Sequence, residues 1–545
     1  MSSASILRLP PWFWIWAVLV AAMLVLRPAV PVDETRYLAV AWEMWWRDSI
    51  AVSYLNGGFY DGKPPLFFWL MQLGWLVSGV NEWWPRLLAP LFGLADLVMV
   101  HLIARRLWGT HQAALLAPLI LVGAIYWALF CASTMFDVLL GFFALLSVHT
   151  LIRVWQGARA RYFVLAGAAL GLGILTKGPV VFLPALFMVL TAPWWMGAER
   201  PVGLAWPAWY RGGLGAAVIA GLIAAAWLVP MSLASDPDYL NNMLFKQSAG
   251  YVADSFSHAR PFWWYLPLLP AMLFPWTFWP RAWRAIASRR VLGDPGTRLC
   301  LAWAVLTFIA FSLISGKQPH YLLLMFPAVA LLLARLLPEA ERGRDYTPLL
   351  VASVPAAAGV ALIVVASGGS TAAHRAAWLA QVPRWLPFAT GAGLIVIGIA
   401  AAGTCGRSLH TRVTMLAATS CAVLLFLTGS FMRASAPAYD LRSTSAVLST
   451  LEARGAPLAM TMHYSGEFNF YGRLKSRVEP IVPAAAPRWA AEHPDGYVIA
   501  FYSPQNWPLP GEPAPQHQTL HRGGGLAVWR AQDLIERPEL FKSFK

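Results

Sequence analysis

Long apolar runs alternate with short polar stretches through most of this chain. A helix needs roughly 20 apolar residues to cross the hydrocarbon of a bilayer, and runs of about that length recur often enough to predict about thirteen spans. They lie near residues 11–30, 86–104, 113–130, 136–152, 162–177, 179–196, 213–231, 263–280, 299–315, 320–337, 348–367, 385–404 and 413–432. The two runs that flank Lys177-Gly178-Pro179 fit either one kinked helix or two short helices.

The composition agrees with a membrane protein of many spans. Of the 545 residues, 58% are hydrophobic and only 12% are charged, whereas roughly a quarter of the residues of a soluble domain are charged. None of the four cysteines lies in the polar tail, which excludes a disulfide framework there, and no CxxC metal motif is present. The first apolar run lacks a small-residue cleavage site, so we expect it to be a retained helix.

The basic residues of the short loops predict the orientation of the chain. One set of loops carries Arg105, Arg106, Arg153, Arg159, Arg161, Arg200, Arg211, Arg281, Arg284, Arg289, Arg290, Arg298, Arg342, Arg344, Arg407 and Arg412. The alternate set, past the first long loop, carries only Lys177, Lys246, Arg260, Lys317, Arg375 and Arg384. The positive-inside rule places the arginine-rich set in the cytoplasm. The N-terminus is then cytoplasmic, and an odd number of spans places the C-terminal tail outside. The net charge of +15 therefore reflects topology, and we expect no nucleic-acid partner.

The character of the chain changes near Ser435. Residues 1–434 form the predicted transmembrane domain, with long outer loops at 31–85 and 232–262. The first of these loops has apolar residues at helical spacing, typical of helices that lie in the membrane interface. Residues 435–545 alternate short apolar runs with Pro, Gly and Asn turns, which predicts a small α/β domain outside the membrane. The expected fold class is thus a polytopic α-helical membrane protein with juxtamembrane helices and an α/β tail.

Polar side chains gather on the predicted outer face, from seven loops or helix ends. They are Asp33, Glu34, Arg36, Asp61, Lys63, Asp137, Lys177, Asp236, Asp238, Lys246, His258, Arg260, Lys317, His320 and Tyr321. An outer cavity lined by carboxylates and amines suits an anionic, lipid-borne substrate. Asp33, Glu34 and Asp137 also fit a simpler interpretation, in which each carboxylate caps or opens a helix. Their shared face favours the functional interpretation for Asp33 and Asp137, while Glu34 fits either.

Two lysines of this outer set stand beside prolines. Lys63 precedes Pro64-Pro65, which hold the loop extended and leave the ammonium as a positioned charge for a phosphate. The alternative is a lysine that reaches from the membrane to the interface. Lys317 and Tyr321 repeat the theme in Ser315-Gly316-Lys317-Gln318-Pro319-His320-Tyr321.

Three further features carry weaker signals. Asp96 lies inside a predicted span, where an ionisable residue is either functional or hydrogen-bonded to a neighbouring helix. His258 and His320 lack close metal-ligand spacing, so we predict no metal site, with a divalent ion as the weaker alternative. Gly167, Gly171 and Gly173 have the spacing of helix-packing contacts within a span rather than of a phosphate loop.

The order of four motifs resembles the GT-C glycosyltransferases, in particular the bacterial branch related to protein O-mannosyltransferases and to the aminoarabinose transferase that modifies lipid A. The motifs are the acidic pair after the first span, KPPL later in the same loop, PFWWYLP from Pro261 to Pro267, and SGKQPHY before a later span. The resemblance covers roughly residues 1–435. It departs from the aminoarabinose transferases at Gly62, where they carry a glutamate, and at Lys246-Gln247, where they carry a Glu-His pair.

The resemblance implies a role for each site residue. Asp33 is the expected catalytic aspartate of the first loop, and Asp137 the second acidic residue near the reaction centre. Lys63 and Tyr321 are expected to contact the phosphate of the lipid donor, with Arg36, Arg260 and Lys317 in support. The remaining cavity candidates are Glu34, Asp61, His258 and His320.

The resemblance also implies the reaction. We expect transfer of a monosaccharide from a polyprenyl-phosphate donor to lipid A, on the periplasmic face of a bacterial inner membrane. Fixed cations beside the departing phosphate would stabilise the transition state more than the ground state. The alternatives are the same chemistry on a protein Ser/Thr or a glycan, and a transporter or flippase for a lipid-linked sugar. Transporters carry polar groups near the membrane midplane and show internal duplication, and this sequence shows neither.

Overall fold

A computed structural model describes residues 9–109, 111–201, 204–236, 239, 259–288, 292–340, 345–367, 382–507 and 514–544. The chain divides into two compact units. Unit 1 comprises residues 1–23, 61–357 and 394–425, and unit 2 comprises residues 24–60, 358–393 and 426–545. His258, Lys246 and Asp238 lie outside the described residues.

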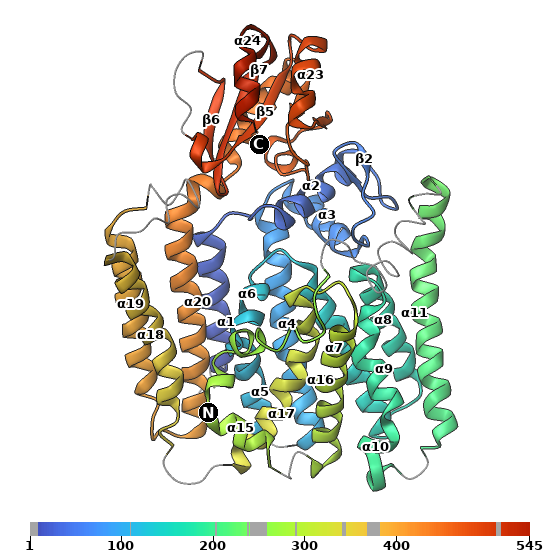
Figure 1. Cartoon of the computed structure of the whole chain (residues 1–545). Coiled ribbons are helices and arrows are strands. Elements are labelled where there is room, and N and C mark those ends of the chain that lie inside the picture. The colour runs from blue at the N-terminus through green and yellow to red at the C-terminus, as the bar shows by residue number, and fades with distance from the viewer. Residues whose placement is uncertain are drawn as a thin grey trace, which may run out of the picture. The chain divides into compact units, whose positions relative to one another are not determined.

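Unit 1 is built from apolar helices (Figure 1). Those that lie wholly within it are α3 (Leu66–Ser78), α4 (Trp83–Trp108), α5 (His111–Gly123), α6 (Ile125–Cys131), α7 (Phe136–Trp155), α8 (Arg161–Lys177), α9 (Phe182–Leu190), α10 (Ala192–Met196), α11 (Trp206–Ala234), α14 (Leu269–Met272), α15 (Pro280–Ile286), α16 (Pro295–Leu313) and α17 (Phe326–Glu339). Short 3-10 turns include η1 (Pro179–Val181), η4 (Trp276–Phe278) and η6 (Pro319–Met325). α7 packs between α4 and α8.

Small residues let α8 and α11 approach closely. A Cβ added to Gly167 would meet the Ala216 carbonyl oxygen at 2.6 Å, and one added to Gly171 would meet Ile223 at 2.7 Å. Gly173 likewise has no room beside Val181. The predicted packing role of these three glycines is confirmed. Near the start of α8, Phe163 packs edge-on against Trp209 of α11.

Several helices of unit 1 are interrupted. The run expected over 113–130 is two helices, α5 and α6, which bend by 77° around Ala124. The stretch at Lys177-Gly178-Pro179 separates two helices rather than kinking one, because Gly178 has φ +88°, a left-handed conformation that favours glycine. Beyond it, α9 and α10 meet at a bend of 52°.

The expected continuous helix over 263–280 is wrong. This stretch consists of turns, the single helical turn α14 and the 3-10 turn η4. Pro261, Pro267, Pro270, Pro275 and Pro280 account for it, because each proline removes an amide donor and clashes with the preceding helical turn. Apolar content predicted a membrane span over this segment, but proline spacing decided its conformation.

Eight helical stretches of the described residues are long and apolar enough to cross a membrane, and up to ten if each bent pair counts as one span. They include α18 (Pro348–Ser367), α19 (Trp385–Ala402) and α20 (Leu409–Tyr439). The polytopic helical fold is therefore confirmed, while the figure of thirteen stays a prediction. α1 (Pro11–Leu26) has 16 residues and is shorter than the other spans.

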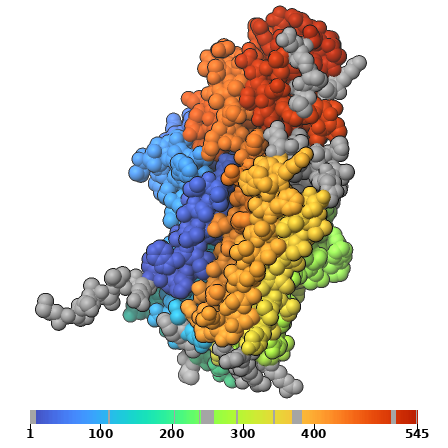
Figure 2. Space-filling model, turned by 90° about the vertical axis from the view of Figure 1, so that its left-hand side faces the viewer, coloured from blue at the N-terminus to red at the C-terminus, as the bar shows by residue number. Residues whose placement is uncertain are grey.

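α18 and α19 lie side by side, next to α20 (Figure 2). Within unit 2 their contact is close, since a Cβ on Gly391 would meet the Gly359 carbonyl oxygen at 2.6 Å. α18 exposes Val360 and Val364 in unit 2, which suits a helix that faces hydrocarbon.

Unit 2 combines the first-loop segment with the tail. The first-loop elements are α2 (Asp33–Trp46), β1 (Tyr54–Leu55) and β2 (Gly58–Phe59). The tail elements are α21 (Arg442–Ala453), β3 (Leu458–Met460), α22 (Asn469–Gly472), β4 (Val478–Pro480), α23 (Ala486–Glu492), β5 (Tyr497–Tyr502), β6 (His517–His521), β7 (Gly524–Arg530) and α24 (Ala531–Glu536). The helices expected in the first loop, and the α/β character of the tail, are confirmed.

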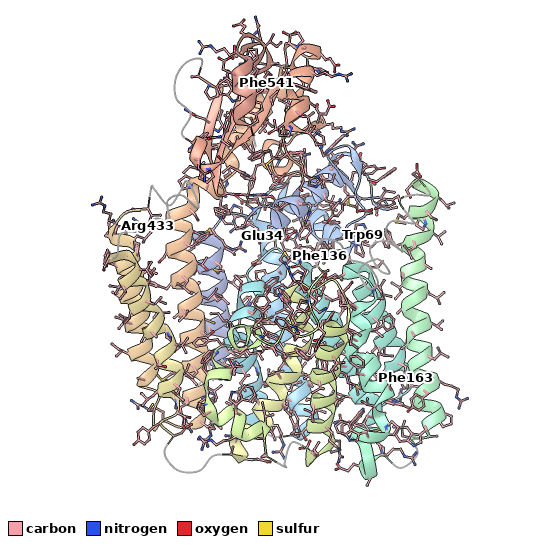
Figure 3. All side chains as sticks on the ribbon, in the orientation of Figure 1. Glu34, Trp69, Phe136, Phe163, Arg433 and Phe541 are labelled. Atoms are coloured by element: carbon pink, nitrogen blue, oxygen red, sulfur yellow. The ribbon has the colours of Figure 1, made fainter. Side chains whose placement is uncertain are left out.

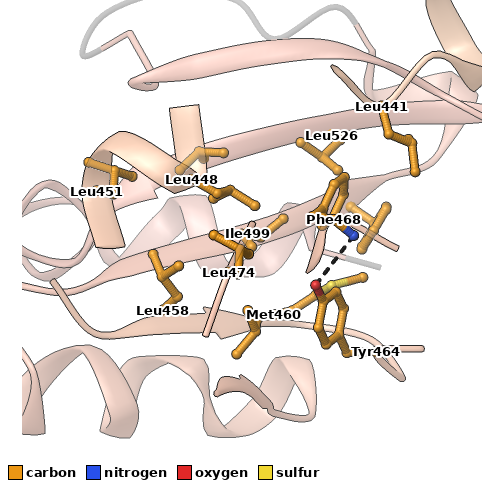
Figure 4. Packing of buried hydrophobic residues seen from close by; sticks show 13 residues of the cluster. Leu441, Leu448, Leu451, Leu458, Met460, Tyr464, Phe468, Leu474, Ile499 and Leu526 are labelled. Carbon is orange, nitrogen blue, oxygen red and sulfur yellow. Dashed lines mark hydrogen bonds between the residues drawn. The ribbon is translucent and has the colours of Figure 1, made fainter. Parts of the chain in front are cut away.

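A five-stranded mixed sheet in the order β4-β3-β5-β7-β6 forms the centre of the tail. β3 pairs parallel with β4 and β5, while β7 pairs antiparallel with β5 and β6. Apolar clusters cover both faces of the sheet. Figure 4 shows one of them, in which the Tyr464 hydroxyl accepts a hydrogen bond from the Phe468 amide at 3.3 Å.

Candidate functional site

A cavity of about 410 Å³ lies in unit 1, at the end of the bundle where α7 begins and α8 ends. Four segments far apart in the sequence line it: the first-loop residues before α3, the α7 start, the α8–α9 connection, and the α16 end with η6. The lining residues are Asp61, Gly62, Lys63, Pro64, Asp137, Leu140, Lys177, Gly178, Pro179, Val180, Leu183, Ala310, Phe311, Ile314, Tyr321, Leu323 and Leu324. Most of the wall is apolar, and the charged groups are confined to two carboxylates and two amines.

Asp137 and Lys177 form the buried centre of this charge cluster. The Lys177 Nζ lies 2.6 Å from Asp137 Oδ1, and the two side chains are 12% and 4% exposed. Asp137 lies in the first turn of α7, where the helix dipole stabilises a negative charge. Lys177 is the last residue of α8, where the helix dipole stabilises a positive charge. The second carboxylate oxygen, Asp137 Oδ2, is buried and has no hydrogen-bond partner among the described residues.

Aromatic packing fixes the start of α7. Phe136 packs edge-on against Phe67 and Phe68 of α3, with ring centroids 4.8 and 5.5 Å apart. In Figure 3 the labelled Phe136 lies among the densely packed side chains of unit 1. Because Asp137 follows Phe136 directly, this packing sets the direction of its carboxylate. α3 directly follows Lys63-Pro64-Pro65. The packing of Phe136 against α3 therefore fixes both the wall that carries Asp137 and the wall that carries Lys63.

Of the site residues expected from the sequence, Lys63, Asp61 and Tyr321 join Asp137 at the cavity. Tyr321 lies in η6, with its ring 5.2 Å from the Lys177 ammonium and 5.6 Å from the ring of Phe311. The sequence placed these residues on one face, and the structure brings them to one cavity.

His320 does not line the cavity. Its ring lies between Phe130, at 5.6 Å, and Tyr321, at 5.0 Å. Among the residues that the structure describes, no three His, Cys, Asp or Glu side chains are grouped to hold a metal ion.

Lys317 and Arg260 do not line the cavity. They lie where the backbone of residues 259–260 pairs with that of residues 315–316. Lys317 is 3% exposed, and its ammonium donates to the carbonyl oxygens of Ile314 and, at 3.0 Å, Arg260. The Arg260 amide in turn donates to Ser315 at 3.2 Å, and Ala259 pairs with Gly316. The Lys317 ammonium is therefore used to join two backbone segments, and the exposed Arg260 guanidinium lies 5.9 Å from the ring of Trp264.

Asp33, Glu34 and Arg36 belong to unit 2, at the start of α2. Arg36 forms an i,i+3 ion pair with Asp33, whose side chain is half exposed. Glu34 is buried in a two-point ion pair with Arg27, at 2.5 and 2.9 Å, and also accepts from the Val30 amide at 2.8 Å. Glu34 thus holds the chain entering α2, while the approach of Asp33 and Arg36 to the cavity of unit 1 stays a prediction.

Lys177 was expected on the outer face, but its position alone predicted no role for it. The signal was present in Lys177-Gly178-Pro179: a lysine at a helix end followed by a glycine and a proline that stop the helix. The apolar wall from Leu183, Phe311 and Leu324 had no such signal, because these residues resemble any other residue of a span.

The arrangement is suited to an anionic group attached to a long apolar chain. Lys63 and Lys177 supply positive charge, Asp61 and Asp137 supply carboxylates, and the remaining wall is apolar. In such a partly desolvated site, fixed ammonium groups act more strongly on a negatively charged oxygen than they would in water.

Comparison with known proteins gives one family match. A family model described as dolichyl-phosphate-mannose-protein mannosyltransferase matches residues 62–219. That stretch contains Lys63, Asp137 and Lys177.

Curated relatives extend the sequence match. The chain is 30% identical over 311 residues to the undecaprenyl phosphate-alpha-4-amino-4-deoxy-L-arabinose arabinosyl transferase of Edwardsiella ictaluri. It is 29% identical over 311 residues to a protein of the same description from Pseudomonas fluorescens. These matches cover 55% and 56% of this chain and 54% and 55% of the relatives, so the chain spans about half the length of the curated relatives it matches.

Two solved structures share the fold over nearly the whole chain. ArnT from Cupriavidus metallidurans bound to undecaprenyl phosphate aligns with a TM-score of 0.69 at 20% identity, covering 95% of this chain and 97% of that one. The same protein in the apo state aligns with a TM-score of 0.70 at 21% identity, covering 95% and 96%. At this identity the likeness establishes the fold.

Proposed function

We propose that this chain, a membrane protein of the GT-C glycosyltransferase superfamily, moves a monosaccharide from a polyprenyl-phosphate donor to lipid A. The observation that carries the proposal is the cavity in which Lys63, Lys177 and Tyr321 surround an apolar space beside the Asp137 carboxylate. The names of the curated relatives favour 4-amino-4-deoxy-L-arabinose as the sugar and undecaprenyl phosphate as its carrier.

The proposed reaction is a direct displacement at the anomeric carbon. An acceptor oxygen forms a bond to that carbon as the bond to the donor phosphate breaks, and the polyprenyl phosphate leaves with the electron pair. Negative charge grows on the departing phosphate, so Lys63 and Lys177 stabilise the transition state more than the ground state. Tyr321 donates to the same phosphate.

The two aspartates have different tasks in this proposal. Asp137 accepts a hydrogen bond from Lys177 through Oδ1 and so holds that ammonium at the cavity. The task proposed for Asp33 depends on what the acceptor is. A phosphate of lipid A is already largely ionised near pH 7, so Asp33 would balance charge, whereas a hydroxyl acceptor would need a general base.

The proposed location is the bacterial inner membrane, with the cavity on the periplasmic face and the N-terminus in the cytoplasm. Multiple apolar helices support a multi-pass protein, and the arginine distribution along the loops supports this orientation. In this orientation residues 435–545 form a periplasmic domain and residues 1–434 a membrane domain. No nucleotide site is needed there, since a lipid-linked donor brings the activated sugar across the membrane.

The test is product formation by the purified full chain in lipid vesicles. With undecaprenyl phosphate-linked aminoarabinose and lipid A, mass spectrometry should detect lipid A that carries the added sugar, and Lys63→Met protein should yield little. Transfer with wild-type protein separates an enzyme from a flippase, which would move the donor and leave lipid A unchanged. Absence of product with correctly folded protein would overturn the proposal.

A second acceptor class has its own support, because the matching family model describes a protein mannosyltransferase. The chemistry and the cavity would be the same, with a Ser/Thr hydroxyl or a glycan as the nucleophile. Mass spectrometry of both lipid A and secreted glycoproteins from a strain lacking this gene decides between the acceptors, since only the true product loses its sugar.

A further inference from the structure

The first-loop hairpin of unit 2 ends in a tight turn at Asn56-Gly57. β1 and β2 pair antiparallel around this turn, with Leu55 opposite Gly58. Asn56 has φ +55° and Gly57 has φ +82°, so both residues are in the left-handed region. An Asn-Gly pair is the preferred sequence for such a two-residue turn, because both residues tolerate positive φ.

The Asn56 side chain binds the backbone of the tail sheet. Its Nδ2 donates to the Val478 carbonyl oxygen at 2.8 Å, and its Oδ1 accepts from the Val478 amide at 2.8 Å. Val478 begins β4, the strand at one edge of the five-stranded sheet. One amide side chain thus satisfies both polar groups of an edge residue, as a neighbouring strand would.

α2 is joined to the tail by separate contacts along its length. The Trp42 indole N–H donates to the Leu474 carbonyl oxygen at 3.1 Å, and the Arg473 guanidinium lies 5.3 Å from the same ring. A Cβ at Gly466 would meet Ala39 of α2 at 3.1 Å and Leu55 of the hairpin at 2.5 Å. Helix and hairpin therefore both lie against the tail.

A buried carboxylate links α2 to its hairpin. Glu43, 2% exposed, accepts from the Gly57 amide at 2.9 Å and from the Arg47 guanidinium at 2.9 Å. Asn56, which binds β4, is therefore joined to α2 through its peptide bond to Gly57 and the hydrogen bond from Gly57 to Glu43. Motion of the tail relative to the hairpin would therefore be passed to α2.

We propose that Asn56 and Trp42 are positioning residues, through which the tail domain fixes the orientation of α2 and thereby of Asp33 and Arg36 at its start. This inference rests on the proposed function, which assigns Asp33 to sugar transfer. α2 is a single 14-residue helix whose start is held by the Arg27–Glu34 ion pair and whose end is held by the tail. The tail is then part of the machinery that sets the reaction geometry.

The test compares Asn56→Gly and Trp42→Phe with wild-type protein in vesicles. Asn56→Gly keeps the left-handed turn and deletes both contacts to Val478, and Trp42→Phe keeps the ring and deletes the indole N–H. We expect kcat to fall about tenfold or more, since a small displacement of catalytic groups is costly, with the KM for donor changed by less than about twofold. Arg488→Ala, which removes an exposed ion pair of the same domain, is the matched control and should leave kcat unchanged.

Hydrogen exchange on the same full-length proteins separates positioning from stability. We expect faster exchange in peptides covering residues 33–46, with β5 and β7 protected as in wild type. Wild-type kcat in both variants, despite faster exchange in α2, would overturn the inference while leaving the proposed function intact. Exchange that increases across the whole tail, with kcat unchanged, would likewise overturn it and assign these contacts to domain stability. A wild-type protein that transfers no sugar would instead refute the proposed function itself.

Discussion

The Lys177 ammonium lies 2.6 Å from the Asp137 carboxylate, and both groups line the cavity of unit 1. The two residues lie on different helices, 40 positions apart in the sequence. Each charge makes burial of the other tolerable, since an isolated charge at this depth would be strongly destabilising. The pair therefore links the stability of the α7–α8 contact to the chemistry of the cavity.

Replacing Lys177 with methionine should reduce both stability and activity. The variant leaves the Asp137 charge buried without its partner, which costs about 3–5 kcal/mol of unfolding free energy. Sugar transfer should fall by at least about a hundredfold, because a cation beside the departing phosphate is lost. Thermal unfolding in detergent and transfer assays in vesicles measure the two effects.

The double variant Lys177→Met/Asp137→Asn is the control for that experiment. Removing both charges should restore much of the thermal stability but none of the transfer activity. If activity returned together with stability, the pair would be purely structural.

Lys63→Met and Lys63→Arg should differ from one another. Lys63 acts as a point charge on phosphate, so methionine should lower kcat/KM by about a hundredfold or more. Arginine keeps the positive charge but replaces the compact ammonium with a planar guanidinium, and should retain part of the activity. Equal and near-normal activity of both variants would exclude Lys63 from the donor site.

Glu34 should prove structural. Glu34→Leu leaves Arg27 buried without a counter-charge and should destabilise the protein by about 3–5 kcal/mol. Arg27→Met/Glu34→Leu removes both charges and should recover most of that loss of unfolding free energy. A double variant that is as unstable as Glu34→Leu alone would show that the buried ion pair is not the source of the destabilisation.

Lys317→Met should act on folding rather than on donor binding. The variant leaves the carbonyl oxygens of Arg260 and Ile314 without the Lys317 ammonium, at a cost of about 1–3 kcal/mol. The KM for the polyprenyl-phosphate donor should stay near the wild-type value when activity is measured well below the melting temperature. A large rise in KM would restore the phosphate-binding role expected from the sequence.

The stability of the tail should fall as the pH drops below about 6.5, because of His521. Burial, with the Arg522 charge nearby, lowers the pKa of His521 to about 3, and its ring packs 5.0 Å from Phe501. Between the pKa of His521 in the folded state, about 3, and its ordinary pKa of about 6.5, unfolding takes up a proton. The free energy of unfolding therefore falls by about 1.4 kcal/mol for each pH unit in this range. His521→Phe should remove this contribution, visible as flatter pH dependence of exchange protection in β5 and β7 of the full-length protein. An identical pH dependence in both proteins would assign the effect to other groups.

The sequence predicted most of the helical architecture, because long apolar runs report burial in a membrane directly. It failed over 263–280, where composition indicated a span but closely spaced prolines prevent a helix. It also treated 113–130 as one helix, although the chain bends at Ala124. Apolar content reports the environment of a segment, and the local backbone decides its shape.

The candidate site was predictable in part. Asp61, Lys63, Asp137 and Tyr321 could be grouped by membrane face, and they line one cavity. Lys317 could not be separated from Lys63 by sequence, because both are lysines beside prolines on the same predicted face. Only the tertiary structure shows that one ammonium is bound by backbone carbonyls while the other lies at a cavity.

The contact between Asn56 and β4 also bears on solubility. An unpaired edge strand can template pairing with a second molecule, and proteins that keep such edges covered avoid this route to aggregation. Here the Val478 amide and carbonyl are already engaged by Asn56. The hairpin thus shields the first residue of this edge, and its loss would favour self-association of the tail during membrane insertion and folding.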